Sequence, residues 1–343
     1  GFERYASDPG DFWTLSHEDV RFLYQDDAGL VWVATRGGGV NLFDPAAPKF
    51  RHQALRSPDP NRRLSGQVQA VARDHGGALW IGTLRGLTRF EAAGRVTWYR
   101  PDPEVSGSLS GERVQAIHVD RGGQVWIGPY EAGLDRFDRA TGGFRNYRHD
   151  PANPSSLSND RVQAILEDRQ GRFWVGTRGG LNLFDRTTGR AVRYLHDQDA
   201  PESLGDDFVW FLLEDRDGKI WVGTDIGGLD RLDPETGKFQ HYRHSADPNS
   251  LANDRVRALY QTADGAIWIG TRFGLDRLES ETGRFRHFFE AQGLPSSTIQ
   301  AILPDLVGNL WLATNGGLAR LDPGSGEITT FDLSDGLRSQ TFS

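Results

Sequence analysis

The sequence predicts an all-β protein, a seven-bladed β-propeller made of four-stranded antiparallel blades. The segment GRFWVGTRGGLNLFD at residues 171–185 recurs along the chain, and every copy reads as short strands separated by turns. One tryptophan marks each copy, at Trp32, Trp80, Trp126, Trp174, Trp221, Trp268 and Trp311. The spacing of 43 to 48 residues between these tryptophans is typical of a repeat array.

Each repeat is expected to form a meander of four strands. In the fourth copy we place them at residues 162–168, 172–177, 180–185 and 191–196. The turns begin at Asp168 and Asp185 and end in glycine, so the glycine can adopt a positive φ while the aspartate side chain caps the turn.

The second strand of the repeat is apolar on both faces. Trp174 and Gly176 point to one side of the sheet, and Phe173 and Val175 point to the other. A ring of blades covers each sheet twice, which a single meander cannot do. We therefore expect the repeat tryptophans to be core residues, and Gly176 to leave room for a ring of the neighbouring blade.

The chain ends supply two candidates for one outer strand. Residues 1–5 (GFERY) and residues 327–333 (EITTFDL) both match the outermost strand of a repeat. We expect the N-terminal strand to close the ring, so that N- and C-terminal strands share the blade of Trp311. Residues 1–343 then form a single propeller domain, with residues 334–343 as a tail leading to a missing C-terminal part. Because the chain has no methionine, we expect it to be an excised segment of a longer protein.

Composition excludes several function classes. The net charge is −8 and no run of lysine and arginine occurs, which argues against nucleic-acid partners and against membrane contact by this segment. The absence of cysteine excludes thiol catalysis. We find no nucleophile elbow, no zinc-protease motif and no phosphate-binding glycine loop. We therefore expect no enzyme, no cofactor and no metal site.

The repeats differ most in the turn after the tryptophan strand. Positions that vary between repeats are free to serve function, because the constant ones already serve the blade. The candidate ligand-binding residues in this turn are Arg36, Arg85, Tyr130, Glu131, Arg178, Asp225, Arg272, Phe273 and Asn315. Arginine binds carboxylates bidentately and flat rings stack on sugars, so the row suits an acidic or hydroxylated ligand. Solvated loop residues without a ligand are the alternative.

A second variable row is the second residue of the innermost strand. It reads Arg21, Gln69, Gln115, Gln163, Trp210, Arg257 and Gln300. A polar row of this kind is consistent with lining the channel of a propeller. Trp210 interrupts it, and we predict either a plug of the channel or a stacking surface for a ligand.

The segment SLSNDRVQAILEDRQGRFWVGTRGGLNLFDRTTG, residues 156–189, resembles the two-component-regulator propeller repeat. Only Pro129 departs from the threonine that ends its tryptophan strand. This family is found in extracytoplasmic sensor regions of hybrid histidine kinases and some diguanylate cyclases. The resemblance implies a periplasmic or extracellular sensor fragment, although this segment has no signal peptide. It also implies an immunoglobulin-like module, a membrane helix and signalling domains elsewhere in the parent chain.

The function expected from these observations is non-catalytic. We predict a sensor propeller of a transmembrane signalling protein that recognises a saccharide or small acidic ligand at the channel mouth. The alternative is a protein-interaction or dimerisation platform, including a homodimer, without a small ligand. A propeller lyase or glycosidase is the third class, and no acid/base pair in the sequence supports it.

Overall fold

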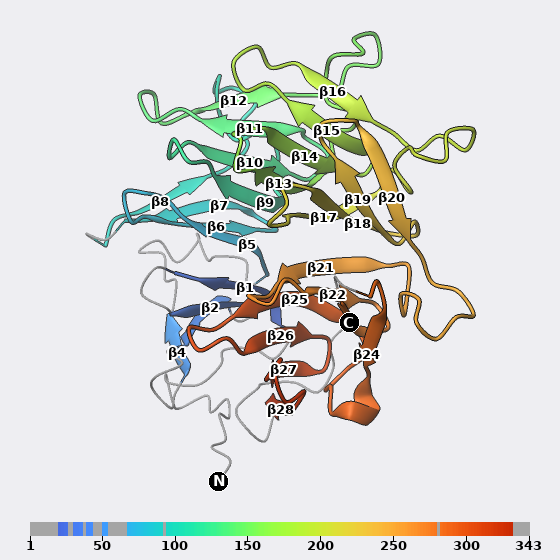
Figure 1. The fold of residues 1–343 in the computed structure, drawn as a ribbon. Coiled ribbons are helices and arrows are strands. Elements are labelled where there is room, and N and C mark those ends of the chain that lie inside the picture. Colours follow the sequence, from blue (N-terminus) through green and yellow to red (C-terminus); the bar gives the residue numbers. More distant parts are fainter. Residues whose placement is uncertain are drawn as a thin grey trace. The chain divides into compact units, whose positions relative to one another are not determined.

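The computed structural model describes residues 20–26, 30–36, 39–43, 50–53, 67–91, 94–279 and 282–331. These residues form seven four-stranded sheets, and the chain is the predicted seven-bladed β-propeller. Strands follow one another in chain order within every sheet (Figure 1). The chain divides into two compact units, residues 72–259 and residues 1–71 with 260–343, which are described separately. No helix among the described residues has the length and apolar character to span a membrane.

Residues 72–259 contain blades two to five. Blade two is β5 (Val68–Arg73), which crosses the unit boundary, β6 (Leu79–Thr83), β7 (Gly86–Phe90) and β8 (Val96–Tyr99). Blade three is β9 (Val114–Val119), β10 (Val125–Pro129), β11 (Leu134–Phe137) and β12 (Phe144–Tyr147). Blade four is β13 (Val162–Glu167), β14 (Phe173–Thr177), β15 (Gly180–Phe184) and β16 (Ala191–Tyr194). Blade five is β17 (Val209–Glu214), β18 (Ile220–Thr224), β19 (Leu229–Asp233) and β20 (Lys238–Tyr242).

The other unit contains blades one, six and seven. Blade one is β1 (Val20–Gln25), β2 (Val31–Thr35), β3 (Gly39–Phe43) and β4 (Phe50–Gln53). Blade six is β21 (Val256–Gln261), which crosses the boundary, β22 (Ile267–Thr271), β23 (Gly274–Leu278) and β24 (Phe285–Phe288), followed by the short η1 (Glu290–Gln292). Blade seven is β25 (Ile299–Pro304), β26 (Leu310–Thr314), β27 (Gly317–Leu321) and β28 (Ile328–Phe331).

The outer strand of blade seven comes from the C-terminal candidate. β28 pairs with β27 in antiparallel register, so the last repeat supplies all four strands of its own blade. The N-terminal strand predicted to close the ring falls on residues 1–5, outside the described residues, as does the tail at 334–343. Within this unit, Val20 and Leu23 of the first blade pack with Trp311 and Ala313 of the last blade.

Blade four shows how the repeat builds the core. All five residues of β14 are buried, as expected for a strand that is apolar on both faces. Phe173 packs in one cluster with Trp126 of blade three, whereas Trp174 packs in another with Val209 of blade five. The sheet of blade four is therefore covered by the blades before and after it.

The aspartate of the first turn and the repeat tryptophan form one hydrogen-bonded unit. In blade four Asp168 Oδ1 accepts the backbone N–H groups of Gln170 and Arg172, which fixes the turn. Asp168 Oδ2 accepts the indole N–H of Trp174 at 3.0 Å, which satisfies the polar atom of an otherwise apolar core residue. In blade six Thr262 replaces the aspartate, and its hydroxyl oxygen accepts the indole N–H of Trp268 at 3.2 Å.

The glycine after the repeat tryptophan makes room for the next blade. A Cβ at Gly176 would lie 2.5 Å from Cγ1 of Val209, the first residue of the next innermost strand. The predicted space therefore exists, but a valine fills it rather than an aromatic ring. The same contact joins Gly128 with Val162.

Candidate functional site

The variable turn is tied to the connection that enters the innermost strand. The first turn residue of three neighbouring blades donates its backbone N–H to the residue just before that strand. The bonds are Tyr130 to Arg113 O (2.6 Å), Arg178 to Arg161 O (3.0 Å) and Asp225 to Phe208 O (3.0 Å). These bonds place a second set of variable residues, Arg113, Arg161 and Phe208, beside the residues of the variable turn. Our sequence reasoning missed this row, although it varies between repeats in the same way.

The row in the innermost strands lies on a β-bulge. In five blades the pairing of the first two strands shifts register at the second residue of the innermost strand. These residues are Arg21 in blade one, Gln115 in blade three, Gln163 in blade four, Trp210 in blade five and Gln300 in blade seven. A bulge redirects a side chain out of the regular alternation. The bulged Trp210 reaches the turn of its own blade, where its indole N–H donates to Asp225 Oδ1 at 3.0 Å. The bulged residues of blades three and four also meet, since Gln163 Nε2 donates to Gln115 Oε1 at 3.0 Å.

Arg178 joins these rows through aromatic rings. Its guanidinium carbon lies 4.5 Å from the ring centre of Phe208 and 5.5 Å from that of Tyr130. Phe208 stacks on Trp210 with 4.6 Å between ring centres. The guanidinium carbon of Arg257, a residue of β21, lies 4.8 Å from the centre of the Trp210 ring. Cations over aromatic faces at these distances attract the ring electrons.

Tyr130 gathers two more arginines that the sequence analysis did not single out. Arg113 and Arg161 place their guanidinium carbons 4.5 and 5.2 Å from the centre of its ring. We call this group the arginine–aromatic cluster. It consists of Arg113, Tyr130, Glu131, Arg161, Arg178, Phe208, Trp210, Asp225 and Arg257, all of which lie in residues 72–259.

The cluster is electropositive in an acidic chain. It brings four guanidinium groups against two carboxylates, whereas the whole chain has a net charge of −8. Glu131 pairs with Arg161, and Asp225 accepts the Trp210 indole, so both carboxylates already have partners. The Nε atom of Arg178 is buried, and it has no hydrogen-bond acceptor among the residues that the structure describes. Among the same described residues, this atom is also buried without an acceptor in Arg89, Arg136 and Arg277. Arg178 differs in that its half-buried guanidinium lies beside two aromatic rings, where an anionic ligand can pair with it.

The remaining predicted residues are placed as follows. Arg85 is exposed at its turn, with its backbone N–H bonded to Thr83 Oγ1. In the other unit, Asn315 Oδ1 accepts Gln300 Nε2 at 2.7 Å, which repeats the pairing of bulge and turn seen at Trp210. Arg272 is exposed, Phe273 is 60% exposed beside Phe289, and Arg36 forms a β-bridge with Gln67. The structure therefore brings together Tyr130, Glu131, Arg178, Trp210 and Asp225 of the predicted set.

A buried acid anchors the connection that carries Phe208. Asp230 is fully buried; its Oδ2 accepts the Gly205 N–H at 2.6 Å, and its Oδ1 lies 2.6 Å from His241 Nδ1. His241 Nε2 lies 2.9 Å from the Pro201 carbonyl oxygen, so a protonated imidazole donates at both ends. The hydrogen bond to Asp230 raises the pKa of His241, and burial raises the pKa of Asp230. Arg243 opposes the protonation of His241 and Lys238 lies on the same strand, paired with Glu202.

This pair predicts a pH dependence of stability. Because the pKa of His241 is raised on folding, its contribution is fully present below the unfolded value of about 6.5 and is lost as pH rises through the folded value. We expect the free energy of unfolding in urea to fall from pH 6 to pH 8.5, and His241→Gln to remove up to about 1 kcal/mol of that fall, since partial exposure screens the pair. An unchanged pH profile in His241→Gln would contradict this role.

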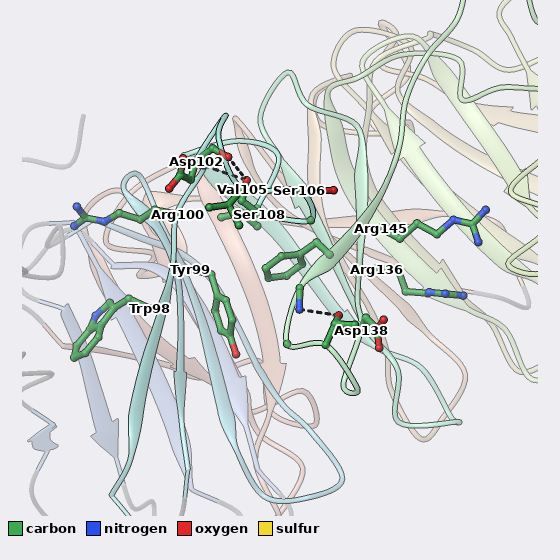
Figure 2. Close-up of a pocket in the computed structure, with 16 residues that line it drawn as sticks. Trp98, Tyr99, Arg100, Asp102, Val105, Ser106, Ser108, Arg136, Asp138 and Arg145 are labelled. Carbon is green, nitrogen blue, oxygen red and sulfur yellow. Dashed lines mark hydrogen bonds between the residues drawn. The ribbon is translucent and has the colours of Figure 1, made fainter.

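A groove of about 520 Å³ lies outside the cluster, at the outer edge between blades two and three. Figure 2 shows the ring of Tyr99 facing it, with Trp98 pointing to one side and the charged ends of Arg136 and Arg145 to the other. The Asp138 carboxylate accepts the backbone N–H of Ala140 and so belongs to its turn. The groove is lined by three arginines and two aspartates, but the charged end of Arg100 points to one side in Figure 2 and those of Arg136 and Arg145 point to the other.

Histidines at the ends of the outer strands fasten the connections between blades. The Nδ1 atoms of His149, His196 and His244 lie 2.7, 2.8 and 2.9 Å from the carbonyl oxygens of Leu157, Leu204 and Leu251. The described residues contain no group of three or more acidic, histidine or cysteine side chains arranged to hold a metal ion.

The family model of the two component regulator propeller matches residues 156–179, 203–225 and 250–273. Each match runs from a connection between blades to the variable turn that follows the tryptophan strand. These three segments are similar to the repeat of the two component regulator propeller family. The matched propeller repeats carry most of the cluster, including Arg161, Arg178, Phe208, Trp210 and Asp225.

Solved structures share the propeller fold of this chain. The extracellular domain of a protein described as a hybrid two component system from B. thetaiotaomicron has 22% identity and a TM-score of 0.66, over 92% of this chain and 47% of that chain. PorZ, a surface component of the type-IX secretion system of Porphyromonas gingivalis, has 19% identity and a TM-score of 0.69, over 93% and 47%. Virginiamycin B lyase from Staphylococcus aureus has 17% identity and a TM-score of 0.57, over 77% and 84%.

These identities show a shared fold, and this chain spans about half the length of the first two proteins. No curated protein matches the sequence.

Proposed function

We propose that the chain is a non-catalytic sensor propeller of a signalling protein, located outside the cytoplasm, and that its arginine–aromatic cluster binds a small acidic ligand. The observation that carries the ligand class is Arg178, whose Nε lacks an acceptor among the described residues and whose guanidinium lies near the rings of Phe208 and Tyr130. A carboxylate supplies the missing acceptor, and the rings beside it offer flat faces to a sugar. An acidic saccharide combines both features.

The location and the signalling role have separate support. Three repeats match the family model of the two component regulator propeller, and one solved structure of the same fold is described as an extracellular domain of a hybrid two component system. A ligand acts on such a parent only through a difference in affinity between two of its states. The propeller supplies the site, and the parent supplies the two states.

The cluster does not resemble an acid/base site. A general base must reach a substrate proton, but Glu131 is paired with Arg161 and Asp225 with the Trp210 indole. The likeness to virginiamycin B lyase therefore concerns the fold, and the residues at this site favour binding over turnover.

Calorimetric titration of the chain with tri-galacturonate and with a neutral trisaccharide tests the proposal. We expect binding of the acidic sugar alone, weakened by added salt because the contact is ionic. Arg178→Ala should weaken it about tenfold or more, because a hydrogen bond to a charged group is worth about 1.5–3 kcal/mol. Arg190→Ala, which removes an exposed arginine at a distant hairpin, is the matched control and should bind like the unmodified chain.

Equal binding of both sugars, or no binding of either, would contradict the proposed ligand class. Concentration-dependent self-association in the absence of ligand would instead favour the protein-interaction platform.

A further inference from the structure

The turn of blade three departs from the repeat. In blades four and five the threonine hydroxyl that ends the tryptophan strand donates to a glycine carbonyl, from Thr177 to Gly180 at 2.9 Å and from Thr224 to Gly228 at 2.8 Å. Pro129 stands at this position in blade three and has no such donor. The turn is held instead from outside, because Arg148 Nη2 donates to the Glu131 carbonyl at 3.1 Å.

Glu131 has an unfavourable backbone conformation in this turn. Its φ is +59°, the one positive value at a non-glycine residue in the part of the chain that the structure describes. A left-handed conformation is disfavoured by about 1–2 kcal/mol for a residue with a Cβ. Such strained conformations are concentrated at functional sites, including ligand-binding and switch segments. Here the conformation places a carboxylate at the edge of the cluster.

The Glu131 side chain forms an ion pair with one of the arginines around Tyr130. Its carboxylate pairs with Arg161, whose guanidinium also lies over the Tyr130 ring at 5.2 Å. The side chains of Glu131 and Arg161 are 53% and 40% exposed. An ion pair this exposed is worth only about 0.2–1 kcal/mol, so a bidentate ligand carboxylate can displace it.

We propose that the Glu131 carboxylate is a built-in competitor that occupies the ligand's place at Arg161 until an anion displaces it. This inference rests on the proposed function in that both concern the same cluster. Displacement frees the turn 129–133 from its pairing with Arg161. Glu131 therefore sets the affinity of the site, and its turn is the element that responds when the site fills.

The test uses inorganic sulfate, an anion without a sugar ring, so that it does not depend on saccharide recognition. Sulfate is titrated by calorimetry at low ionic strength into the unmodified chain, Glu131→Gln and Glu112→Gln. Glu112 is an exposed carboxylate next to Arg113, so its substitution changes the net charge equally without touching the pair. We expect Glu131→Gln to bind sulfate about three- to fivefold more tightly. Glu112→Gln should stay within about 1.5-fold of the unmodified chain, because solvent screens its charge.

Equal gains in Glu131→Gln and Glu112→Gln would overturn the inference, since the effect would then be general charge alone. Failure of Glu131→Gln to bind sulfate would overturn it as well. Tighter sulfate binding by Glu131→Gln together with no tri-galacturonate binding would support the competitor role and reject the acidic saccharide. Tri-galacturonate binding without tighter sulfate binding by Glu131→Gln would support the acidic saccharide and reject the competitor role.

Discussion

Replacing Trp174 with alanine should lower the free energy of unfolding by about 4 kcal/mol, because a large buried ring leaves a cavity that the blade cannot close. Trp174 is fully buried in the cluster that joins blades four and five. Urea unfolding at pH 7, followed by circular dichroism, measures the loss. Trp98→Ala is the control, since that tryptophan lies on an outer strand and is only partly buried. Equal losses in the two variants would mean that the repeat tryptophans are not the core of the fold.

Replacing Asp168 with alanine should lower the free energy of unfolding by about 3 kcal/mol. The substitution removes the acceptor of the buried Trp174 indole and both turn bonds to Gln170 and Arg172. A buried donor left without a partner destabilises by about 1–3 kcal/mol, and the lost cap adds about 1 kcal/mol. Asp185→Ala is matched to it, because Asp185 caps the other hairpin of the same blade but is exposed. Its effect should be much smaller.

The same aspartate predicts sensitivity to acid. Burial alone would raise the pKa of Asp168, but hydrogen bonds from Trp174 and Arg172 outweigh burial and lower it. Its contribution is therefore present above its ordinary pKa and is lost as pH falls through the folded value. Unfolding at pH 7 and at pH 3 should show a smaller acid loss in Asp168→Ala than in the unmodified chain. An identical acid loss would contradict the buried unit of aspartate and tryptophan.

The fold could be predicted because the sequence of a single repeat contains the signals that specify its strands and turns. The two-sided apolar strand around Trp174 demands cover on both faces, and the turn beginning at Asp168 sets the register of the strands that it joins. Both signals are local in sequence and recur along the chain, with Thr262 in place of the aspartate in blade six. The sequence predicted a space beside Gly176 but not that Val209 fills it, because this depends on which residue of the next blade packs there.

The candidate site was predicted only in part because its residues meet through contacts between blades. Variation in the turns indicated Tyr130, Arg178 and Asp225. Phe208 and Arg161 join them because their carbonyl oxygens accept the backbone N–H groups of Asp225 and Arg178, and such bonds do not appear in a strand pattern. Variation at the residue before each innermost strand was the signal that could have found them.

Arg178 Nε has no hydrogen-bond acceptor among the described residues, and we propose that an acidic ligand provides one. The most direct measurement follows the side-chain Nε–H signal of Arg178 in ¹H–¹⁵N spectra, assigned with Arg178→Lys, while tri-galacturonate is added. The signal should move downfield and saturate at the affinity found by calorimetry, because a new acceptor deshields the proton. A signal that stays in place while calorimetry reports binding would put the ligand elsewhere on the propeller and contradict the site.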